Sequence, residues 1–340
     1  MYRGPGRLEL EEMDEPVAAQ GEVLIEVEAA GVCGTDRHLV AGELKVPEGL
    51  VPGHETAGRI AAVGSGVEGW DIGDPVVTYG QVVCGICAAC AAGRQNRCAH
   101  PEGFGMARQG GFAELLTAPV GSVLHRPAGV SAALGAVATD AIATPFHALS
   151  TVARVRPGET VVIVGAGGLG LHGVLLARLM GAGRIVAVDP SDEARQAALL
   201  AGADEVFDPG SVERPDRVLR ALAGGASAAF EFVGRAETVE LALHALAPGG
   251  RLVIVGVGHD QPVLPPIARF IGMELSVHGS FGSTPAEIET VLSLIAAGRL
   301  DVSRSVTAEL PLEDGPGVLA QPGGPGRTVL RPQREGTNGR

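Results

Sequence analysis

Short stretches of alternating polar and apolar residues occupy the first third of the chain. Residues 22–29 (EVLIEVEA) alternate in this way, as a half-buried strand does. Residues 57–64 and 76–79 predict two further strands, and glycine or proline stands between them. Short strands with such breaks are typical of a barrel-like antiparallel sheet. We therefore expect a mainly antiparallel β domain in this part of the chain.

The pattern changes near residue 160, where fully apolar runs begin to alternate with helical segments. Repeated strand and helix units of this kind predict a parallel, doubly wound sheet. The expected strands cover residues 160–164, 184–188, 205–207, 228–233, 251–255 and 275–279. The expected helices cover residues 171–180, 192–201, 212–223, 236–247 and 285–298.

These patterns divide the 340 residues into two domains. Residues 145–283 are expected to form the doubly wound domain. Residues 1–144 and 284–340 are expected to form the other, with the helix at 285–298 returning the chain to it. A helix from Ala132 to Leu149, interrupted at Pro145, spans the first boundary. After Leu312 only one short strand is predicted, at 328–330, and the last eight residues are expected to be disordered.

Composition and charge exclude several functions. The net charge of −13 argues against a nucleic-acid partner, which would need a basic face. No basic amphipathic segment indicates a membrane surface, and the first residues lack the apolar core of a signal peptide. The apolar stretch Val161–Ala182 imitates a membrane span, but it contains a buried strand, a glycine turn and a helix. We expect a soluble, cytoplasmic protein.

A glycine-rich loop follows the strand at 160–164 and leads directly into a helix. Its sequence, Gly165-Ala166-Gly167-Gly168-Leu169-Gly170, matches the G-x-G-x-x-G fingerprint of dinucleotide binding, in the context that the fingerprint requires. The glycines permit a tight turn and a close approach of the pyrophosphate. Asp189 ends the next strand and could accept from the adenosine ribose hydroxyls. A carboxylate there would repel a 2′-phosphate, so NAD is favoured over NADP.

The five cysteines fall into a cluster of four and a single residue. Cys84, Cys87, Cys90 and Cys98 are spaced to close a tetrahedral shell, which predicts a structural zinc. The alternatives are a redox pair or unliganded core cysteines. Cys33 stands apart, 21 positions before His54. Thiolate and imidazole suit a catalytic zinc with an open position, although a buried Cys and a satisfied loop His would look the same.

The motifs together resemble the zinc-dependent alcohol dehydrogenases of the medium-chain dehydrogenase/reductase superfamily. The resemblance covers about residues 3–332 and rests on Cys33-Gly-Thr-Asp, Gly53-His54-Glu55, the four-cysteine lobe at 84–98, the glycine loop and Gly249-Gly250-Arg-Leu. It implies an N-terminal GroES-like catalytic domain and a Rossmann domain. It also implies two zinc ions per chain and a homodimer or homotetramer.

The resemblance also implies individual roles. The catalytic zinc would be held by Cys33, His54 and Asp140, and Glu55 can approach or join it. Asp36 would orient the His54 ring, and Thr35 and His38 match the hydroxyl and imidazole of the family's proton relay. Cofactor contacts would come from the glycine loop with Asp189, and from Thr144, Val255 and Arg327, the last of these at the pyrophosphate. Gly80 replaces a bulky residue and implies a roomier substrate pocket.

The expected reaction is the interconversion of an alcohol, preferably a secondary one, and its ketone or aldehyde. Zinc would polarise the substrate oxygen, Thr35 and His38 would carry the proton away, and the hydride would pass to NAD. A polyol, sugar or threonine-type amino-alcohol dehydrogenase of the same superfamily would use the same chemistry. A non-catalytic nucleotide-binding protein is a remoter alternative, because neither the ligands, the relay Thr nor the glycine loop is lost.

Overall fold

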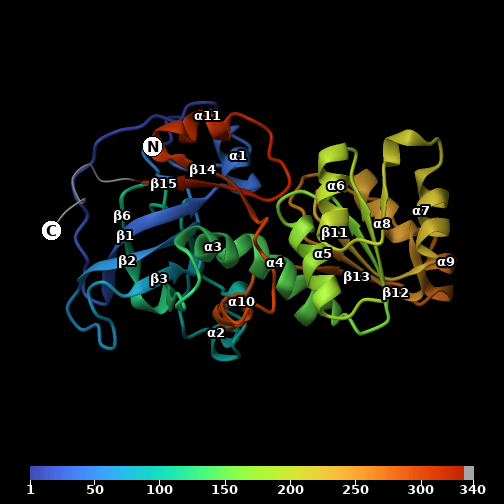
Figure 1. Ribbon diagram of the computed structural model, residues 1–340, viewed down its shortest axis with the longest axis horizontal. Coiled ribbons are helices and arrows are strands. Elements are labelled where there is room, and N and C mark those ends of the chain that lie inside the picture. The colour runs from blue at the N-terminus through green and yellow to red at the C-terminus, as the bar shows by residue number, and fades with distance from the viewer. Residues whose placement is uncertain (333–340) are drawn as a thin grey trace. The chain divides into compact units, whose positions relative to one another are not determined.

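The computed structural model describes residues 1–332 and divides into two compact units (Figure 1). The first contains residues 1–143, 283–323 and those from Arg327 on, and the second contains residues 144–282 and 324–326. The sequence had suggested boundaries after residues 144 and 283, and it had not assigned 324–326 to the second unit. The final eight residues, for which disorder was expected, lie outside the described part.

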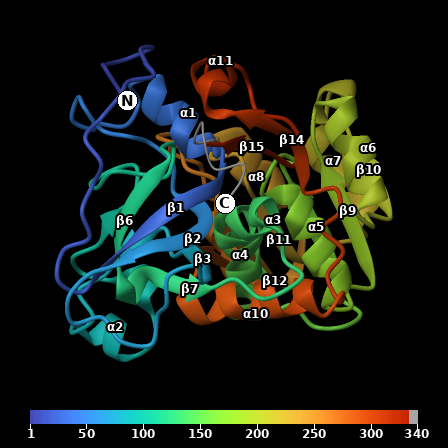
Figure 2. The same ribbon diagram turned by 60° about the vertical axis from the view of Figure 1, so that its left-hand side comes forward.

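A seven-stranded sheet is the framework of the first unit (Figure 2). Its order is β14-β15-β1-β2-β3-β7, and β6 also pairs with β1. The pairs are antiparallel except β14 with β15. The strands are β1 (Glu22–Gly31), β2 (Glu55–Val63), β3 (Pro75–Thr78), β6 (Leu115–Pro119), β7 (Val123–His125), β14 (Val306–Pro311) and β15 (Arg327–Arg331). The predicted antiparallel domain is confirmed.

Alternation along β1 explains how this sheet packs. Val23, Ile25 and Val27 are buried on one face and belong to the core of the first unit. Short strands β4 (Gln81–Val82) and β5 (Glu102–Gly103) pair separately. The helices of the unit are α1 (Gly34–Val40), α2 (Ala88–Ala91), α3 (Ala132–Val137), α10 (Pro285–Ala296) and α11 (Gly315–Leu319). Neither β14 nor α11 had been predicted.

A six-stranded parallel sheet forms the second unit, as predicted (Figure 1). The strand order is β10-β9-β8-β11-β12-β13, so the order reverses between β8 and β11. The crevice at such a reversal is where open α/β sheets bind their ligands. The strands are β8 (Thr160–Val164), β9 (Arg184–Val188), β10 (Glu205–Phe207), β11 (Ala226–Glu231), β12 (Leu246–Ile254) and β13 (Ser276–Gly279).

Helices flank this sheet and cover its apolar strands. α5 packs with α6, and α7 packs with α8. The helices are α5 (Gly170–Leu179), α6 (Asp192–Leu200), α7 (Pro215–Ala223), α8 (Ala236–His244) and α9 (Ile267–Gly272). Val162, Val164 and Val186 have almost no exposed surface, which explains the fully apolar runs in the sequence.

One helical stretch runs without a break from Ala132 to Ala153. Two parts of it, Ala138–Ile142 and His147–Ala153, are π-helical, and α4 (Ala143–Phe146) lies between them. The expected interruption at Pro145 is wrong, because the helix continues through the proline with these widened turns on either side. The stretch is long and apolar enough to cross a membrane, but 83% of its most apolar window is buried within the protein.

Candidate active site

Four metal-ligating side chains from three parts of the first unit meet in one cluster, which we call the mixed cluster: Cys33, His54, Glu55 and Asp140. Cys33 follows β1 and is the residue before α1, while Glu55 begins β2. The register of β1 and β2 sets Gly31 opposite Glu55. A Cβ atom at residue 31 would lie 2.0 Å from Glu55 Oε2, so only glycine leaves room for that carboxylate. Asp140 comes from the first π-helical segment.

The spacing of the donor atoms fits a zinc ion. All four ligand atoms lie within 4.8 Å of one another. Cys33 Sγ is 3.5 Å from Asp140 Oδ2, and His54 Nε2 is 3.8 Å from the same oxygen. Ligands bound at the usual zinc distances in a tetrahedron lie roughly 3.3–3.7 Å apart. Thiolate, imidazole and carboxylate are also the ligand types that catalytic zinc takes.

Asp36 ties this cluster to the backbone around it. Its side chain is 2% exposed and accepts hydrogen bonds from the N–H groups of Cys33 (2.9 Å) and Gly53 (3.3 Å). Asp36 Oδ1 also lies 3.4 Å from His54 Nδ1. With Nδ1 directed at a carboxylate, Nε2 is the ring nitrogen available to the cluster.

Arg327 contacts the mixed cluster, which the sequence had not indicated. Its guanidinium is buried and lies 2.9 Å from Glu55 Oε1, 3.4 Å from Cys33 Sγ and 3.5 Å from Asp140 Oδ2. Burial lowers the pKa of Arg327, but these anionic neighbours outweigh burial and raise it. The suggested contact of Arg327 with the cofactor pyrophosphate stays a prediction.

The buried acids and bases of the cluster are electrostatically coupled. Burial raises the pKa of Glu55 to about 7, with Arg327 opposing the shift and Asp140 adding to it. For His54, burial lowers the pKa, but Asp36, Asp140 and Cys33 more than compensate and raise it well above its usual value. Excess negative charge at this cluster therefore favours any bound cation.

The residues expected to relay protons lie on α1, directly after Cys33. Thr35 Oγ1 is 3.8 Å from Cys33 Sγ, so its hydroxyl lies beside the cluster. His38 is one turn further along, and its side chain is 48% exposed. Its Nδ1 is 2.7 Å from Glu43 Oε2, a contact that the sequence had not predicted.

The glycine loop of the second unit follows β8 and opens α5. A Cβ atom at residue 170 would lie 1.7 Å from the carbonyl oxygen of Gly165, so the turn requires glycine there. Asp189 Oδ2 accepts from Ala166 N–H at 2.9 Å, and its Oδ1 accepts from Ser191 N–H. Asp189 thus lies at the loop. Val255 follows β12 and Thr144 is buried in α4.

The four cysteines of the lobe also converge, as a second group within 4.8 Å. Cys84 and Cys98 have their sulfurs 3.5 Å apart, which is too far for a disulfide and suitable for a shared ion. Hydrogen bonds from backbone N–H groups, first that of Ala99, lower the pKa of Cys87 to about 6. Burial raises the pKa of Cys90 to about 12. Four thiols and no carboxylate fit a closed structural site.

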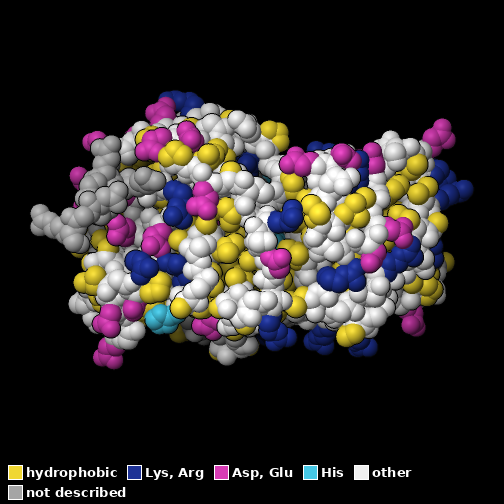
Figure 3. Space-filling model, in the orientation of Figure 1, with side chains coloured by type: hydrophobic (Ala, Val, Ile, Leu, Met, Phe, Trp, Pro, Cys, Tyr) yellow, Lys and Arg dark blue, Asp and Glu magenta, His cyan; other side chains and the backbone are white. Residues whose placement is uncertain are grey.

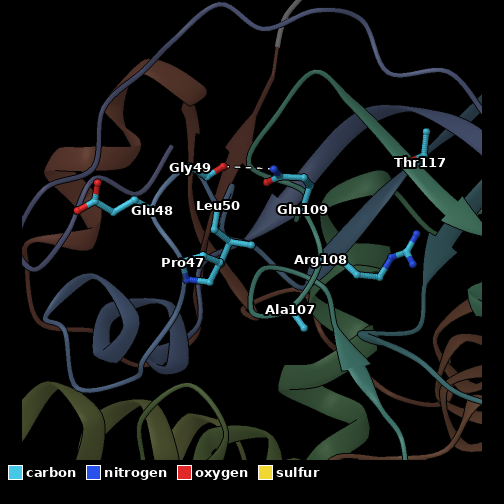
Figure 4. Close-up of a pocket in the computed structure, with 8 residues that line it drawn as sticks. All are labelled: Pro47, Glu48, Gly49, Leu50, Ala107, Arg108, Gln109 and Thr117. Atoms are coloured by element: carbon cyan, nitrogen blue, oxygen red, sulfur yellow. Dashed lines mark hydrogen bonds between the residues drawn. The ribbon is translucent and has the colours of Figure 1, made fainter.

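An open pocket of 360 Å³ lies elsewhere in the first unit (Figure 4). Two of its polar side chains are already engaged. Gln109 donates to Gly49 O at 3.2 Å and accepts from Val51 N–H, and Arg108 pairs with Glu22 and Glu102. None of the predicted site residues lines it. The lining residues are Pro47, Glu48, Gly49, Leu50, Ala107, Arg108, Gln109 and Thr117.

Comparison with known proteins agrees with both units. Residues 19–128 match the alcohol dehydrogenase GroES-like domain, and residues 168–297 match the zinc-binding dehydrogenase family. The chain is 35% identical over 297 residues to an alcohol dehydrogenase of Geobacillus stearothermophilus, covering 86% of each protein. The chain belongs to the zinc-binding alcohol dehydrogenase family of the medium-chain dehydrogenase/reductase superfamily.

Two further relatives widen the range of substrates and cofactors in this family. An L-threonine 3-dehydrogenase of Pyrococcus abyssi is 33% identical over 314 residues, with 88% of this chain and 87% of the relative covered. A crystal structure described as a zinc-binding dehydrogenase from Sinorhizobium meliloti 1021, bound to NADP, has a TM-score of 0.88 and 30% identity, with 96% of each chain covered. The predicted GroES-like and Rossmann folds, dehydrogenase class and use of zinc with a nicotinamide cofactor are confirmed.

Proposed function

We propose that this family member oxidises secondary alcohols to ketones with NAD, and catalyses the reverse reduction, with a zinc ion held by Cys33, His54 and Asp140. The observation that carries the proposal is the mixed cluster, whose donors are spaced for zinc beside the hydroxyl of Thr35. Zinc, when bound, supplies Lewis-acid polarisation of the substrate oxygen, and the nicotinamide takes or gives the hydride.

The chain's own residues would then position ligands and move a proton. Asp36 holds the His54 ring so that Nε2 points to the cluster. Arg327 forms an ion pair with Glu55, so that carboxylate already has a cationic partner. Thr35 takes the hydroxyl proton of the alcohol and passes it on to His38, whose exposed side chain releases it to water.

The cofactor would bind at the glycine loop, and we propose that NAD is preferred to NADP. Gly165, Gly167, Gly168, Leu169 and Gly170 would cradle the pyrophosphate at the start of α5, with Thr144, Val255 and Arg327 as further contacts. Asp189 would repel a 2′-phosphate. The NADP in the Sinorhizobium meliloti structure makes a direct test necessary. Asp189→Ala should lower the ratio of kcat/KM for NAD to that for NADP, and an unchanged ratio would contradict this role.

Two observations bear on the substrate. Gly80 supports a secondary alcohol, because a Cβ atom there would lie 3.4 Å from the carbonyl oxygen of His54, so this position adjoins a residue of the mixed cluster and places no side chain against it. The L-threonine 3-dehydrogenase relative supports an amino-alcohol as the alternative, and a polyol would be oxidised by the same chemistry. A panel of secondary alcohols, polyols, L-threonine and aldehydes, assayed with NAD and NADP, separates the two. Turnover of L-threonine or sorbitol above all simple secondary alcohols would overturn our proposal.

We also propose a cytoplasmic homo-oligomer, either a dimer or a tetramer. β13 is an edge strand with β12 on one side, and the segment that precedes it in the chain exposes large apolar side chains, namely Val263, Leu264, Ile267 and Ile271. An exposed apolar group of this kind is typical of an interface with a second copy. Light scattering of Ile267→Asp/Ile271→Asp against the unchanged protein tests this; a native monomer would contradict it.

The acidic surface gives no support for a polyanionic partner. Figure 3 shows Asp and Glu side chains interspersed with Arg and Lys over the visible face. A non-catalytic role would leave zinc-loaded protein without turnover on every substrate in the panel and with either cofactor.

A further inference from the structure

His38 and Glu43 form a side-chain pair that the proposed relay does not yet use. Nδ1 of His38 lies 2.7 Å from Glu43 Oε2. In the described part of the chain, Glu43 is the carboxylate that pairs with His38. The side chains are 48% and 53% exposed, so their contribution to folding stability is small. What the contact changes is the chemistry of the ring.

The turn that ends α1 brings Glu43 back to His38. Glu43 N–H donates to the carbonyl oxygen of His38 at 3.0 Å, so backbone and side chain of Glu43 both return to the same residue. Gly42 makes this possible with φ of +82°. A Cβ atom at residue 42 would also lie 2.7 Å from the ring of Pro5. The turn therefore depends on glycine and holds Glu43 in place.

A carboxylate beside one ring nitrogen of a histidine determines which nitrogen carries the proton and which one can accept a proton. An ionised carboxylate only accepts hydrogen bonds, so Nδ1 must carry the proton in this contact. In the neutral ring Nε2 is then the basic nitrogen. The other groups around α1 do not compete. The neighbouring Arg37 donates to Gln321 O at 2.7 Å, and α11, which packs against α1, has no titratable side chain.

We propose that Glu43 is a positioning residue of the proton relay, holding the His38 ring so that Nε2 faces the incoming proton. This rests on the relay through Thr35 and His38 in the proposed function. Nε2 accepts one proton released from the alcohol, and Nδ1 keeps its own proton on Glu43. The ring then gives the Nε2 proton to water and returns to its starting form, so the proton count closes.

The test compares Glu43→Ala with Glu43→Asp and with Glu48→Ala, which removes a nearby exposed carboxylate from the same loop. The zinc-loaded protein is labelled with 15N-histidine, and two-bond 1H–15N spectra report the tautomer of His38, assigned by its loss in His38→Gln. We expect a proton on Nδ1 in the unchanged protein and in Glu48→Ala, and a mixture of tautomers in Glu43→Ala. We expect kcat for alcohol oxidation to fall about three- to tenfold in Glu43→Ala with an unchanged KM for the alcohol, and Glu43→Asp to recover part of it.

The outcomes distinguish a failure of the role of Glu43 from a failure of the relay through Thr35 and His38. If His38→Gln is slow but Glu43→Ala keeps both the wild-type tautomer and the wild-type kcat, the role of Glu43 is overturned and the relay stands. Equal losses in Glu43→Ala and Glu48→Ala also overturn it. If His38→Gln is as fast as the unchanged protein, the relay in the proposed function fails first.

Discussion

The two groups of metal-ligating residues in the first unit are built in opposite ways. The lobe draws four thiols from one short stretch, residues 84–98. The mixed cluster draws a thiol, an imidazole and two carboxylates from residues 33, 54, 55 and 140. One group is closed by local chain geometry, whereas the other depends on strand register and a helix far along the chain.

Their surroundings differ as much as their origins. The lobe sulfurs accept from nearby backbone N–H groups, such as those of Cys84 and His100 with Cys98 Sγ. The mixed cluster is surrounded by charge, with Asp36 behind His54 and Arg327 against Glu55. A closed set of thiolates suits a permanent structural ion, while a mixed set with an adjacent hydroxyl suits chemistry.

The largest effect is expected from Asp140→Asn, which keeps the size of the side chain and removes its charge. If Asp140 ligates zinc, turnover should fall by roughly 10³-fold or more. Loss of a residue that only hydrogen-bonds to a zinc ligand already lowers metal affinity or activity about 10–100-fold, and loss of a ligand should cost more. Elemental analysis should show one zinc per chain in place of two, with an unchanged circular dichroism spectrum. An active Asp140→Asn with two zinc ions would give the third ligand position to another residue, with Glu55 as the nearest candidate.

Cys87→Ser tests the four-cysteine lobe. Loss of the lobe zinc should lower the free energy of unfolding by about 4–5 kcal/mol, since structural zinc contributes directly to folding. Thermal unfolding measures this, and the zinc that remains should still support turnover below the new transition. A variant that is catalytically dead but as stable as the unchanged protein would reverse our assignment of the two groups.

Asp36→Asn should disturb only the mixed cluster. An amide can present its N–H to His54 Nδ1 and so favour the wrong ring nitrogen, which should weaken zinc binding there about 10–100-fold. Competition with a chelator measures the affinity, with release of the lobe zinc followed in the same titration as the internal control. Equal weakening of both ions would mean that Asp36 acts on the fold and not on the cluster.

The smallest effect is a pH dependence of the zinc-depleted protein. The folded pKa of Glu55, about 7, lies above its ordinary value of 4.5, so the folded chain binds more protons than the unfolded chain between these values. Stability should therefore fall as pH rises through this window, by at most about 1.4 kcal/mol per pH unit. Glu55→Gln should flatten this slope in denaturant titrations, whereas the lobe variant should not.

Much of the fold follows from periodicity in the sequence. The runs at 160–164 and 184–188 are buried on both faces, so their apolar pattern is unbroken and their limits match β8 and β9. β14 was not predicted, although it alternates in the way that predicted β1, with Val306, Ala308 and Leu310 less exposed than the residues between them. The helix through Pro145 was misjudged, because widened turns absorb the proline and leave no mark in a sequence pattern.

The lobe and the mixed cluster also differ in how far the sequence predicts them. The lobe is visible in the spacing of its cysteines alone. Asp140 was suggested only by family resemblance, since nothing local links it to Cys33. The contact of Arg327 with Glu55 joins residues 272 positions apart, and only the strand arrangement brings them together. Glu43 was within reach of sequence reasoning, because a glycine just after a helix predicts a turn that folds back on its last residues.

The π-helical segment Ala138–Ile142 sets a limit on how this enzyme can be altered. A widened turn holds one residue more than an α-helical turn, so the backbone could close its hydrogen bonds again after losing one residue there. Each residue of an α-helix turns the chain by about 100°. A single deletion ahead of Asp140 would thus keep the helix and swing the carboxylate off the mixed cluster. The number of residues in the helix ahead of Asp140, and not only their identity, is therefore constrained.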